Sequence, residues 1–134
     1  NRVNTNTMVQ DTNNSWTVAQ STTQLMDTST TNRISFVVGL TEDFYKAVVT
    51  TIGSSGASNN TGVAIGYDST SSACGSYTVA PTGAVGTVTA VCIQQPLGFH
   101  YFQALDRNQD GTGNGTVAGT FAGSSEGFTL NFRN

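Results

Sequence analysis

Few residues in this chain are suited to acid–base or nucleophilic chemistry. There is one histidine, His100, together with eight carboxylates and two cysteines. The motifs Gly-x-Ser-x-Gly and His-Glu-x-x-His, which position a nucleophile or a zinc ion beside its base, are absent from the sequence. His100, Asp68 and one of the many serines could be combined into a Ser-His-Asp catalytic triad, but their spacing in the sequence does not indicate one. We therefore expect a protein that is not an enzyme.

The two cysteines, Cys74 and Cys92, are the minimum for one disulfide. A hairpin that turns at residues 81–83 places them opposite each other, and opposed Cα atoms at a non-hydrogen-bonded site lie about 4.5 Å apart, within disulfide range. We predict a Cys74–Cys92 disulfide that staples this hairpin, with two separately buried thiols as the alternative. Neither cysteine is expected to be catalytic, because there is no Cys-x-x-Cys motif and no cationic neighbour.

The segment that begins at Asp106 matches the opening of an EF-hand calcium loop. Asp106, Asn108 and Asp110 stand at the first, third and fifth positions, and Gly111 stands at the sixth. The twelfth position holds Val117 in place of the bidentate glutamate, and the flanking residues resemble strands. We expect a plain turn and no cofactor, with calcium binding as the alternative. A transition-metal site is less favoured still, because one histidine and two cysteines supply too few ligands.

The elements that position these residues are predicted to be strands. Only 10% of the residues are charged, and Gly, Ser, Thr and Asn are abundant, a composition that favours strands and turns over helices. Apolar residues alternate with polar ones nearly everywhere, and no helical periodicity persists. An all-β fold with minimal helix follows.

The clearest strand covers residues 33–40, and residues 128–132 repeat its alternation. Further strands are expected at 16–22, 45–52, 62–67, 76–80, 85–93, 99–105 and 116–121. About nine short strands predict a two-sheet antiparallel β-sandwich, for which a jelly roll is the natural candidate. The predicted core consists of Ile34, Phe36, Val38, Val63, Ile65, Phe128, Leu130 and Phe132.

A length of 134 residues fits one domain. We assign residues 16–134 to a single β-sandwich domain and the polar residues 1–15 to an extended N-terminal arm or linker. The net charge is −3, and the five basic residues form no cluster, so nucleic acid and anionic membranes are not expected partners. No apolar run approaches the roughly 18 residues that span a bilayer, and we expect no membrane insertion.

The strand at 99–105 carries aromatic residues on both faces. Phe99, Tyr101 and Gln103 lie on one face, and His100 and Phe102 lie on the other. A strand in a two-sheet sandwich turns only one face to the core, so a loop, a ligand or another subunit must cover the second. We predict that these five residues form a subunit interface, because buried aromatics stabilise homo-oligomers. A loop-covered strand is the alternative, and parity alone does not say which face is buried.

Three blocks follow one another along the chain: Arg-Ile-Ser-Phe-Val-Val-Gly-Leu at 33–40, Val-Ala-Ile-Gly-Tyr-Asp-Ser-Thr at 63–70 and Leu-Gly-Phe-His-Tyr-Phe-Gln-Ala-Leu-Asp at 97–106. In this order they resemble a C-terminal domain found on structural proteins of tailed bacteriophages. That family has Val-Ser-Phe-Val-x-Gly, Gly-Ile-Gly-Leu-Asp-Ser-Thr and Gly-Tyr-His-Tyr-Leu-Gln-Ala-Leu-Glu blocks. The resemblance runs from about Asn32 to the C-terminus. The 106–115 loop and the cysteine pair depart from it, so neither calcium nor the disulfide is implied.

The resemblance implies a domain on the virion surface with a jelly-roll fold similar to trimeric tumour-necrosis-factor-like and C1q-like heads. We expect a virion structural protein, the knob of a fibre or appendage that contacts a glycan or protein of the host surface. The alternatives are a capsid decoration protein that stabilises the head, and a carbohydrate-binding module that uses Trp16, Tyr67 or Tyr77 to stack on sugars. The expected partners are other copies of the chain, in a homotrimer, and other virion proteins.

Overall fold

Alternating side chains build β4 (Arg33–Val38), in which Ile34, Phe36 and Val38 are buried while Val37 between them is exposed. Branched and aromatic side chains at every second position favour the extended backbone and bury one face of it. Among the residues that the structure describes, almost all regular structure is strand, with one three-residue 3-10 turn, η1 (Met26–Thr28). The computed structural model describes residues 4–9, 16–19, 22–40, 44–54, 61–75, 77–79, 85–94, 97–108, 115–118 and 127–133.

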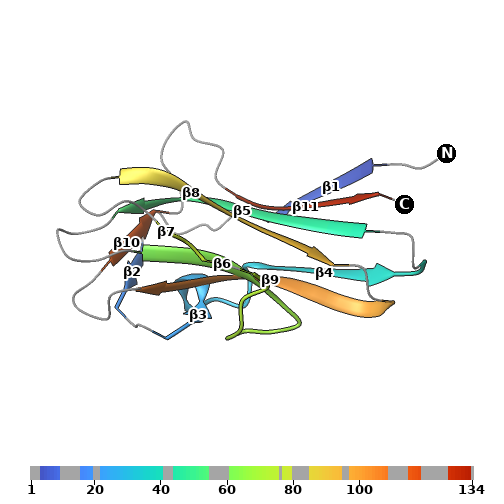
Figure 1. The fold of residues 1–134 in the computed structure, drawn as a ribbon, viewed down its shortest axis with the longest axis horizontal. Coiled ribbons are helices and arrows are strands. Elements are labelled where there is room, and N and C mark those ends of the chain that lie inside the picture. The colour runs from blue at the N-terminus through green and yellow to red at the C-terminus, as the bar shows by residue number, and fades with distance from the viewer. Residues whose placement is uncertain are drawn as a thin grey trace.

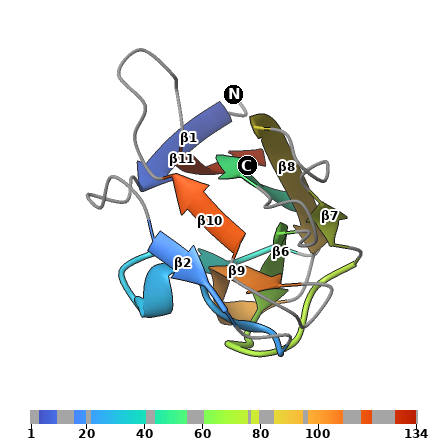
Figure 2. The ribbon, with the colours of Figure 1, turned by 90° about the vertical axis from the view of Figure 1, so that its left-hand side faces the viewer.

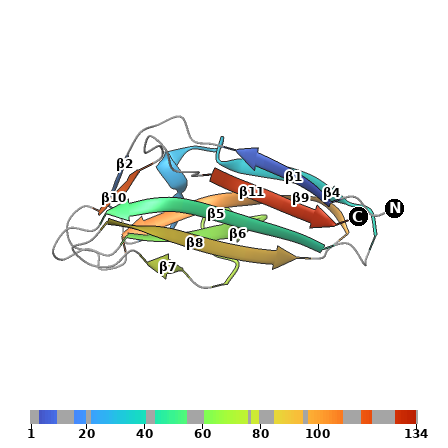
Figure 3. The same cartoon turned by 90° about the horizontal axis from the view of Figure 1, so that it is seen from above.

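The first sheet, sheet A, is built around β5 (Phe44–Ser54). β8 pairs along one edge of β5, while β11 and then β10 pair along the other edge. β1 extends the sheet from β11, and β2 extends it from β10. Figure 3 shows β8, β5, β11 and β1 side by side in that order. The strands around β5 are β1 (Asn4–Val9), β2 (Trp16–Val18), β8 (Val85–Gln94), β10 (Gly115–Ala118) and β11 (Gly127–Arg133).

The second sheet, sheet B, is built around β9 (Gly98–Asn108). β6 (Thr61–Tyr67) pairs along one edge of β9, and β4 followed by β3 (Gln24–Leu25) pairs along the other. β7 (Thr78–Val79) pairs with the far edge of β6. Seen end on, β5 and β11 of sheet A lie over β6 and β9 of sheet B (Figure 2). Every pairing in both sheets is antiparallel, so the predicted fold class is confirmed: the chain is an all-β, two-sheet antiparallel sandwich.

The two sheets face each other in Figure 1, and the buried core residues lie between them. Phe36 of β4 stacks between Tyr45 of β5, at 4.6 Å between ring centroids, and Phe102 of β9, at 4.8 Å. Five of the eight residues predicted for the core are buried, and the side chains of Phe128, Leu130 and Phe132 lie outside the described part of the structure. The buried cluster consists of Met26, Ile34, Phe36, Val38, Tyr45, Ala47, Val49, Val63, Ile65, Cys92, Phe102 and Ala104.

The described residues form eleven strands, against about nine expected. The two additions are β1 and the two-residue β3. β1 falls within residues 1–15, the segment predicted to be an arm, yet Asn4 to Val9 pair in register with Arg133 to Phe128 of β11. The backbone ladder of an edge strand needs no apolar periodicity, which explains why the polar sequence of this segment gave no strand signal.

Candidate interaction surface

The two halves of β9 have different surroundings. Phe102 and Ala104 face the core, and on the opposite face of the same stretch Gln103 and Leu105 are also fully buried, at 0% exposure. At the start of the strand, Phe99 is 69% exposed. The strand that the sequence predicts to be aromatic on both faces is therefore covered on both faces only in its second half.

The segment that follows η1 covers the second half of β9. The Gln103 side-chain amide donates to the carbonyl oxygens of Asn32 at 2.8 Å and Ser29 at 3.3 Å, and its Oε1 accepts from Nε of Arg33 at 3.0 Å. The Ala104 N–H also donates to the Asn32 carbonyl. The prediction that Phe102 and Gln103 face another subunit is therefore wrong, because their own chain already buries them. For this half the loop-covered alternative holds.

An exposed apolar patch remains at the other end of β9. Val37 of β4 pairs directly with Phe99, and their exposed side chains lie side by side on the outer face of sheet B. Leu97 and Leu40, which adjoin the same ends of the two strands, are 56% and 55% exposed. We call Val37, Leu40, Leu97 and Phe99 the apolar patch. Exposed apolar residues gathered at one end of a sheet make this patch a candidate interaction surface.

Tyr101 continues the outer face of β9 beyond Phe99. The guanidinium carbon of Arg33 lies 4.1 Å from the centroid of its ring, a cation–π arrangement that covers part of the aromatic surface. Of the five residues predicted for the interface, Phe99 is thus the one with a widely exposed side chain, while Tyr101 and His100 are half-buried. The interface predicted from the sequence did not include Val37, Leu40 and Leu97. One sequence feature could have indicated them: Val37 is an apolar residue on the otherwise polar face of β4.

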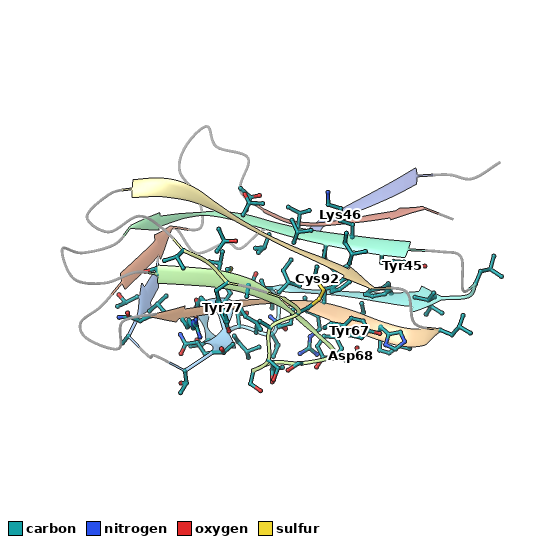
Figure 4. All side chains as sticks on the ribbon, viewed as in Figure 1. Tyr45, Lys46, Tyr67, Asp68, Tyr77 and Cys92 are labelled. Atoms are coloured by element: carbon teal, nitrogen blue, oxygen red, sulfur yellow. A yellow bond between two sulfur atoms is a disulfide. The ribbon has the colours of Figure 1, made fainter. Side chains whose placement is uncertain are left out.

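His100 follows Phe99 in the chain, on the opposite face of β9, and its side chain contacts Asp68, which follows the last residue of β6 (Figure 4 labels Asp68 and Tyr67). His100 Nδ1 lies 2.6 Å from Asp68 Oδ2, and His100 Nε2 lies 2.9 Å from the carbonyl oxygen of Leu97. Asp68 Oδ1 accepts from the Tyr101 N–H at 2.9 Å, and the Asp68 N–H donates to the Tyr101 carbonyl at 3.0 Å. The ring of Tyr67 stacks on His100 at 5.2 Å between centroids.

These contacts favour the ionised forms of both partners. The hydrogen bond to the Leu97 carbonyl, followed by the one to Asp68, raises the pKa of His100. Burial by itself raises the pKa of Asp68, but hydrogen bonds from His100 and the Tyr101 N–H outweigh it and leave that pKa lowered. Burial, and then the charge of Asp68, raises the pKa of Tyr67 to about 12. Near neutral pH, Asp68 is therefore a carboxylate beside a histidine that binds protons more tightly than usual.

His100 and Asp68 are therefore in contact in the structure, although their spacing in the sequence gave no reason to pair them. The pair resembles the histidine and aspartate of a catalytic triad, but both ring nitrogens of His100 already face acceptors. A general base needs one nitrogen with a lone pair directed at its substrate. In this arrangement, His100 acts as a structural link between β6 and the turn before β9.

The disulfide between Cys74 and Cys92 is present, with 5.7 Å between the two Cα atoms. Its predicted setting is wrong: the cysteines are not partners across a hairpin. Cys74 lies in the loop after β6, where its N–H donates to the Ile65 carbonyl, whereas Cys92 lies in β8 opposite Ala47 of β5. The short β7 pairs with β6, so β8 is left to sheet A, and the disulfide connects the two sheets. Residues 81–83, the proposed turn, lie outside the described residues.

The plain turn expected from Asp106 onward does not begin there, and neither does the calcium loop that was its alternative. Asp106 and Asn108 lie within β9, buried and paired with Val63 and Thr61 of β6, whereas the first positions of an EF-hand belong to a loop that wraps its ion. Asp110 lies outside the described residues. Where side chains are described, no three His, Cys, Asp or Glu residues gather into a potential metal site.

The aromatic platforms suggested for sugar binding are only partly open. The Arg107 guanidinium carbon lies 3.8 Å from the ring centroid of Tyr77, and the Tyr77 hydroxyl contacts that of Thr23. The ring of Tyr67 is taken up by His100 and, at a tilt, by Phe102. The side chain of Trp16 is not among those described. Other side chains therefore already contact the rings of both Tyr67 and Tyr77, which leaves neither ring fully open for stacking on a sugar.

Comparison of the chain with models of protein families and with curated proteins found no match. Over the part of the chain that is described, no helix has the length and apolarity to cross a membrane. Any functional assignment therefore depends on the fold, the apolar patch and the residues around His100.

Proposed function

We propose that this chain is a non-enzymatic structural protein of a bacteriophage particle, the surface-exposed knob of a fibre or appendage that contacts the host. The observation that supports this most is the order in which its strands pair. In chain order, β1 pairs with β11, β4 with β9, β5 with β8 and β6 with β7, so that each pair is nested inside the one before.

Nested antiparallel pairs describe a long hairpin rolled into two sheets, which is the winding of a jelly roll. Jelly rolls are common in viral capsid and lectin domains. The nested pairing therefore supports the jelly-roll head that the phage resemblance implies. The same fold serves many functions, so the assignment to a virion rests on the resemblance together with this topology.

The contacts of His100 support a role without catalysis. It is the single histidine of the chain, and its two ring nitrogens are directed at Asp68 and Leu97. The buried second half of β9 offers no reactive group at the surface. What the described surface offers is apolar area for contact with another protein.

The apolar patch supports assembly into a homotrimer. Val37 and Phe99 expose about two thirds of their surface, and such area is stabilising once it is buried against a partner. The low charge of the chain, 10% of residues, allows large surfaces to meet without burying unpaired ions. In this proposal the apolar patch contributes to the contact between subunits.

Electron microscopy with a gold-labelled antibody against this domain tests the proposal on phage particles whose genome encodes the chain. The proposal expects label at the distal end of a fibre or appendage. Label spread over the head faces would identify a decoration protein instead. Particles that lack the chain altogether would overturn the structural role, and strong selective binding on a glycan array without incorporation into particles would favour a carbohydrate-binding module.

A further inference from the structure

The two ring nitrogens of His100 both face oxygen atoms that accept hydrogen bonds: a carboxylate oxygen of Asp68 at 2.6 Å and the carbonyl oxygen of Leu97 at 2.9 Å. We propose that His100 forms a pH-sensitive link, here called the clasp, between the turn at Leu97 and the end of β6. As an imidazolium the ring donates hydrogen bonds to both Leu97 and Asp68. When the ring gives one proton to solvent, the hydrogen bond to Leu97 is released. This inference rests on the ring contacts and not on the proposed virion role.

Hydrogen-bond chemistry dictates that both contacts need the charged ring. An imidazolium donates from both nitrogens, whereas a neutral imidazole donates from one and carries a lone pair on the other. A neutral His100 therefore directs a lone pair at either the Asp68 carboxylate or the Leu97 carbonyl, and that contact becomes repulsive. The bond to a carboxylate is the stronger of the two, so the neutral ring keeps its proton on Nδ1 and gives up Leu97.

The groups around the ring favour the charged state. Asp68, from the end of β6, is the carboxylate that faces it among the described side chains. Tyr67 of β6 stacks on the ring, and with a pKa of about 12 its phenol stays neutral when His100 titrates. Phe36 of β4 lies 6.2 Å away between centroids. Arg33 of β4 is directed at the ring of Tyr101 and at Gln103.

The turn that the clasp holds depends on a glycine. Gly98, between Leu97 and the rest of β9, has a φ of +115°, a region that side-chain-bearing residues rarely occupy. A Cβ at Gly98 would also come within 3.4 Å of His100 Nε2. Leu97 and Phe99 of the apolar patch flank this glycine, so release of the Leu97 carbonyl alters the geometry of the patch. The same side chains present one surface in acid and another in base.

NMR titration of the whole chain tests the clasp, and the single histidine makes the ring signals unambiguous. At about pH 5.5, below the usual histidine value of about 6.5, both ring nitrogens should carry protons. Above the midpoint, Nδ1 should keep its proton while Nε2 loses one, and the backbone signals of Leu97 and Gly98 should shift with the same midpoint, which should exceed about 6.5. A ring that is already neutral at about pH 5.5, a neutral ring protonated on Nε2, or unchanged Leu97 signals would overturn the proposal.

Asp68→Asn tests the role of the carboxylate. Asp68 has a φ of +48°, which asparagine tolerates better than other residues, and the Asn side-chain oxygen can still accept from the Tyr101 N–H. The His100 midpoint should fall by about one pH unit or more. Lys46→Gln, which removes a charge from an exposed site on β5, is the matched control and should leave the midpoint unchanged. Equal midpoints in Asp68→Asn and the wild-type protein would contradict the clasp.

His100→Gln tests whether the ring itself drives the change at Leu97. The glutamine keeps a hydrogen-bond donor but does not titrate, so the Leu97 and Gly98 signals should become independent of pH between about 5.5 and 9. A far-UV circular dichroism spectrum matching that of the wild-type protein establishes that the variant is folded. If the backbone signals of Leu97 in this folded variant still shift with pH at the wild-type midpoint, another group is responsible for the shift and the proposal is wrong.

Discussion

Asp68 shows how a single residue can organise one end of the sandwich. Its φ of +48° is uncommon for a residue with a side chain. The Asp68 N–H and both carboxylate oxygens contact β9, through the Tyr101 backbone and the His100 ring. Because these hydrogen bonds hold its backbone and its side chain at once, the strained conformation persists. Asp68 therefore ends β6 and fixes the start of β9.

The shifted pKa values of His100 and Asp68 predict how stability depends on pH. The pKa of His100 is raised in the folded chain, so its contribution is complete below about 6.5 and is lost as the pH rises through the folded value. The pKa of Asp68 is lowered, so its contribution is present above about 3.9 and is lost as the pH falls through the folded value. The pair therefore stabilises most between about pH 4 and 6.5.

Urea unfolding at about pH 5.5 and 8.5 measures this effect. The stability lost in His100→Gln relative to the wild-type protein should be larger at the lower pH, because the charged ring is what the variant lacks. A loss that is equal at both pH values would contradict the assignment of an imidazolium.

Gly66 in β6 is predicted to tolerate no side chain. A Cβ there would collide with the Ser69 carbonyl oxygen and come within 3.1 Å of Leu105 Cδ1. Since the first obstacle is backbone, Gly66→Ala should lower the free energy of unfolding by about 1–3 kcal/mol. Gly39→Ala is the control, because nothing lies within 4 Å of its added Cβ. Urea unfolding should separate the two variants, and equal stabilities would show that the turn after Gly66 adapts.

At the scale of residues, the sequence predicts burial better than it predicts partners. Phe36 and Ile65 sit in plain alternations, so their place in the core follows from periodicity. Asp68 and His100 are 32 residues apart, and they meet because Tyr67 pairs with Phe102 across β6 and β9. That register depends on tertiary packing, which a single sequence does not reveal.

Among the elements, the strands with a clear apolar face are those that the sequence predicts well. β4, β5, β6, β8 and β9 all lie where alternation indicates them, within a few residues at their ends. β1 has no such face, and its pairing with β11 follows from the need to cover a sheet edge. The hairpin proposed for the cysteines failed for a related reason. Two neighbouring strands were assumed to pair, whereas β7 and β8 belong to different sheets.

The disulfide is predicted to stabilise the domain by linking elements of both sheets. Cys74 and Cys92 are 18 residues apart, and closing a loop of this length contributes about 3 kcal/mol. The Cys74→Ser, Cys92→Ser double variant should lose about that much free energy of unfolding in urea while remaining folded, because the core between the sheets is otherwise intact. Thiol titration of the unfolded, unreduced wild-type protein should find no reactive thiol. Two reactive thiols would show that the bond is not formed in solution.

Viewed as a whole molecule, the sandwich exposes apolar residues on both outer faces. Val37 and Phe99 lie on the outer face of sheet B, and Val91 and Ile93, at 47% and 55% exposure, lie on β8 of sheet A. Surfaces on opposite sides of one subunit can meet head to tail, and such contacts close into rings when the rotation fits. This arrangement suits a cyclic oligomer, whereas an isologous dimer would use one surface twice and leave the other exposed.

Charged substitutions at three sites test the proposed homotrimer. Phe99→Glu places a carboxylate in the apolar patch, so it should dissociate the trimer into folded subunits, because a buried unpaired charge is strongly unfavourable. Phe102→Glu places the same charge in the core, where Phe102 stacks on Phe36, and should unfold the subunit instead. Val91→Glu, on the outer face of sheet A, reports whether that surface is the other side of the contact.

Light scattering at micromolar concentration, with circular dichroism to establish folding, distinguishes these outcomes. The wild-type protein should have three times the 14.0 kDa mass of one chain, and folded Phe99→Glu should have the mass of one. Dissociation of folded Val91→Glu would support a head-to-tail contact that uses both sheets, whereas retention of the trimer would confine the contact to sheet B. A wild-type mass near 14.0 kDa, or a Phe99→Glu variant that stays trimeric, would show that the apolar patch does not join copies of this chain.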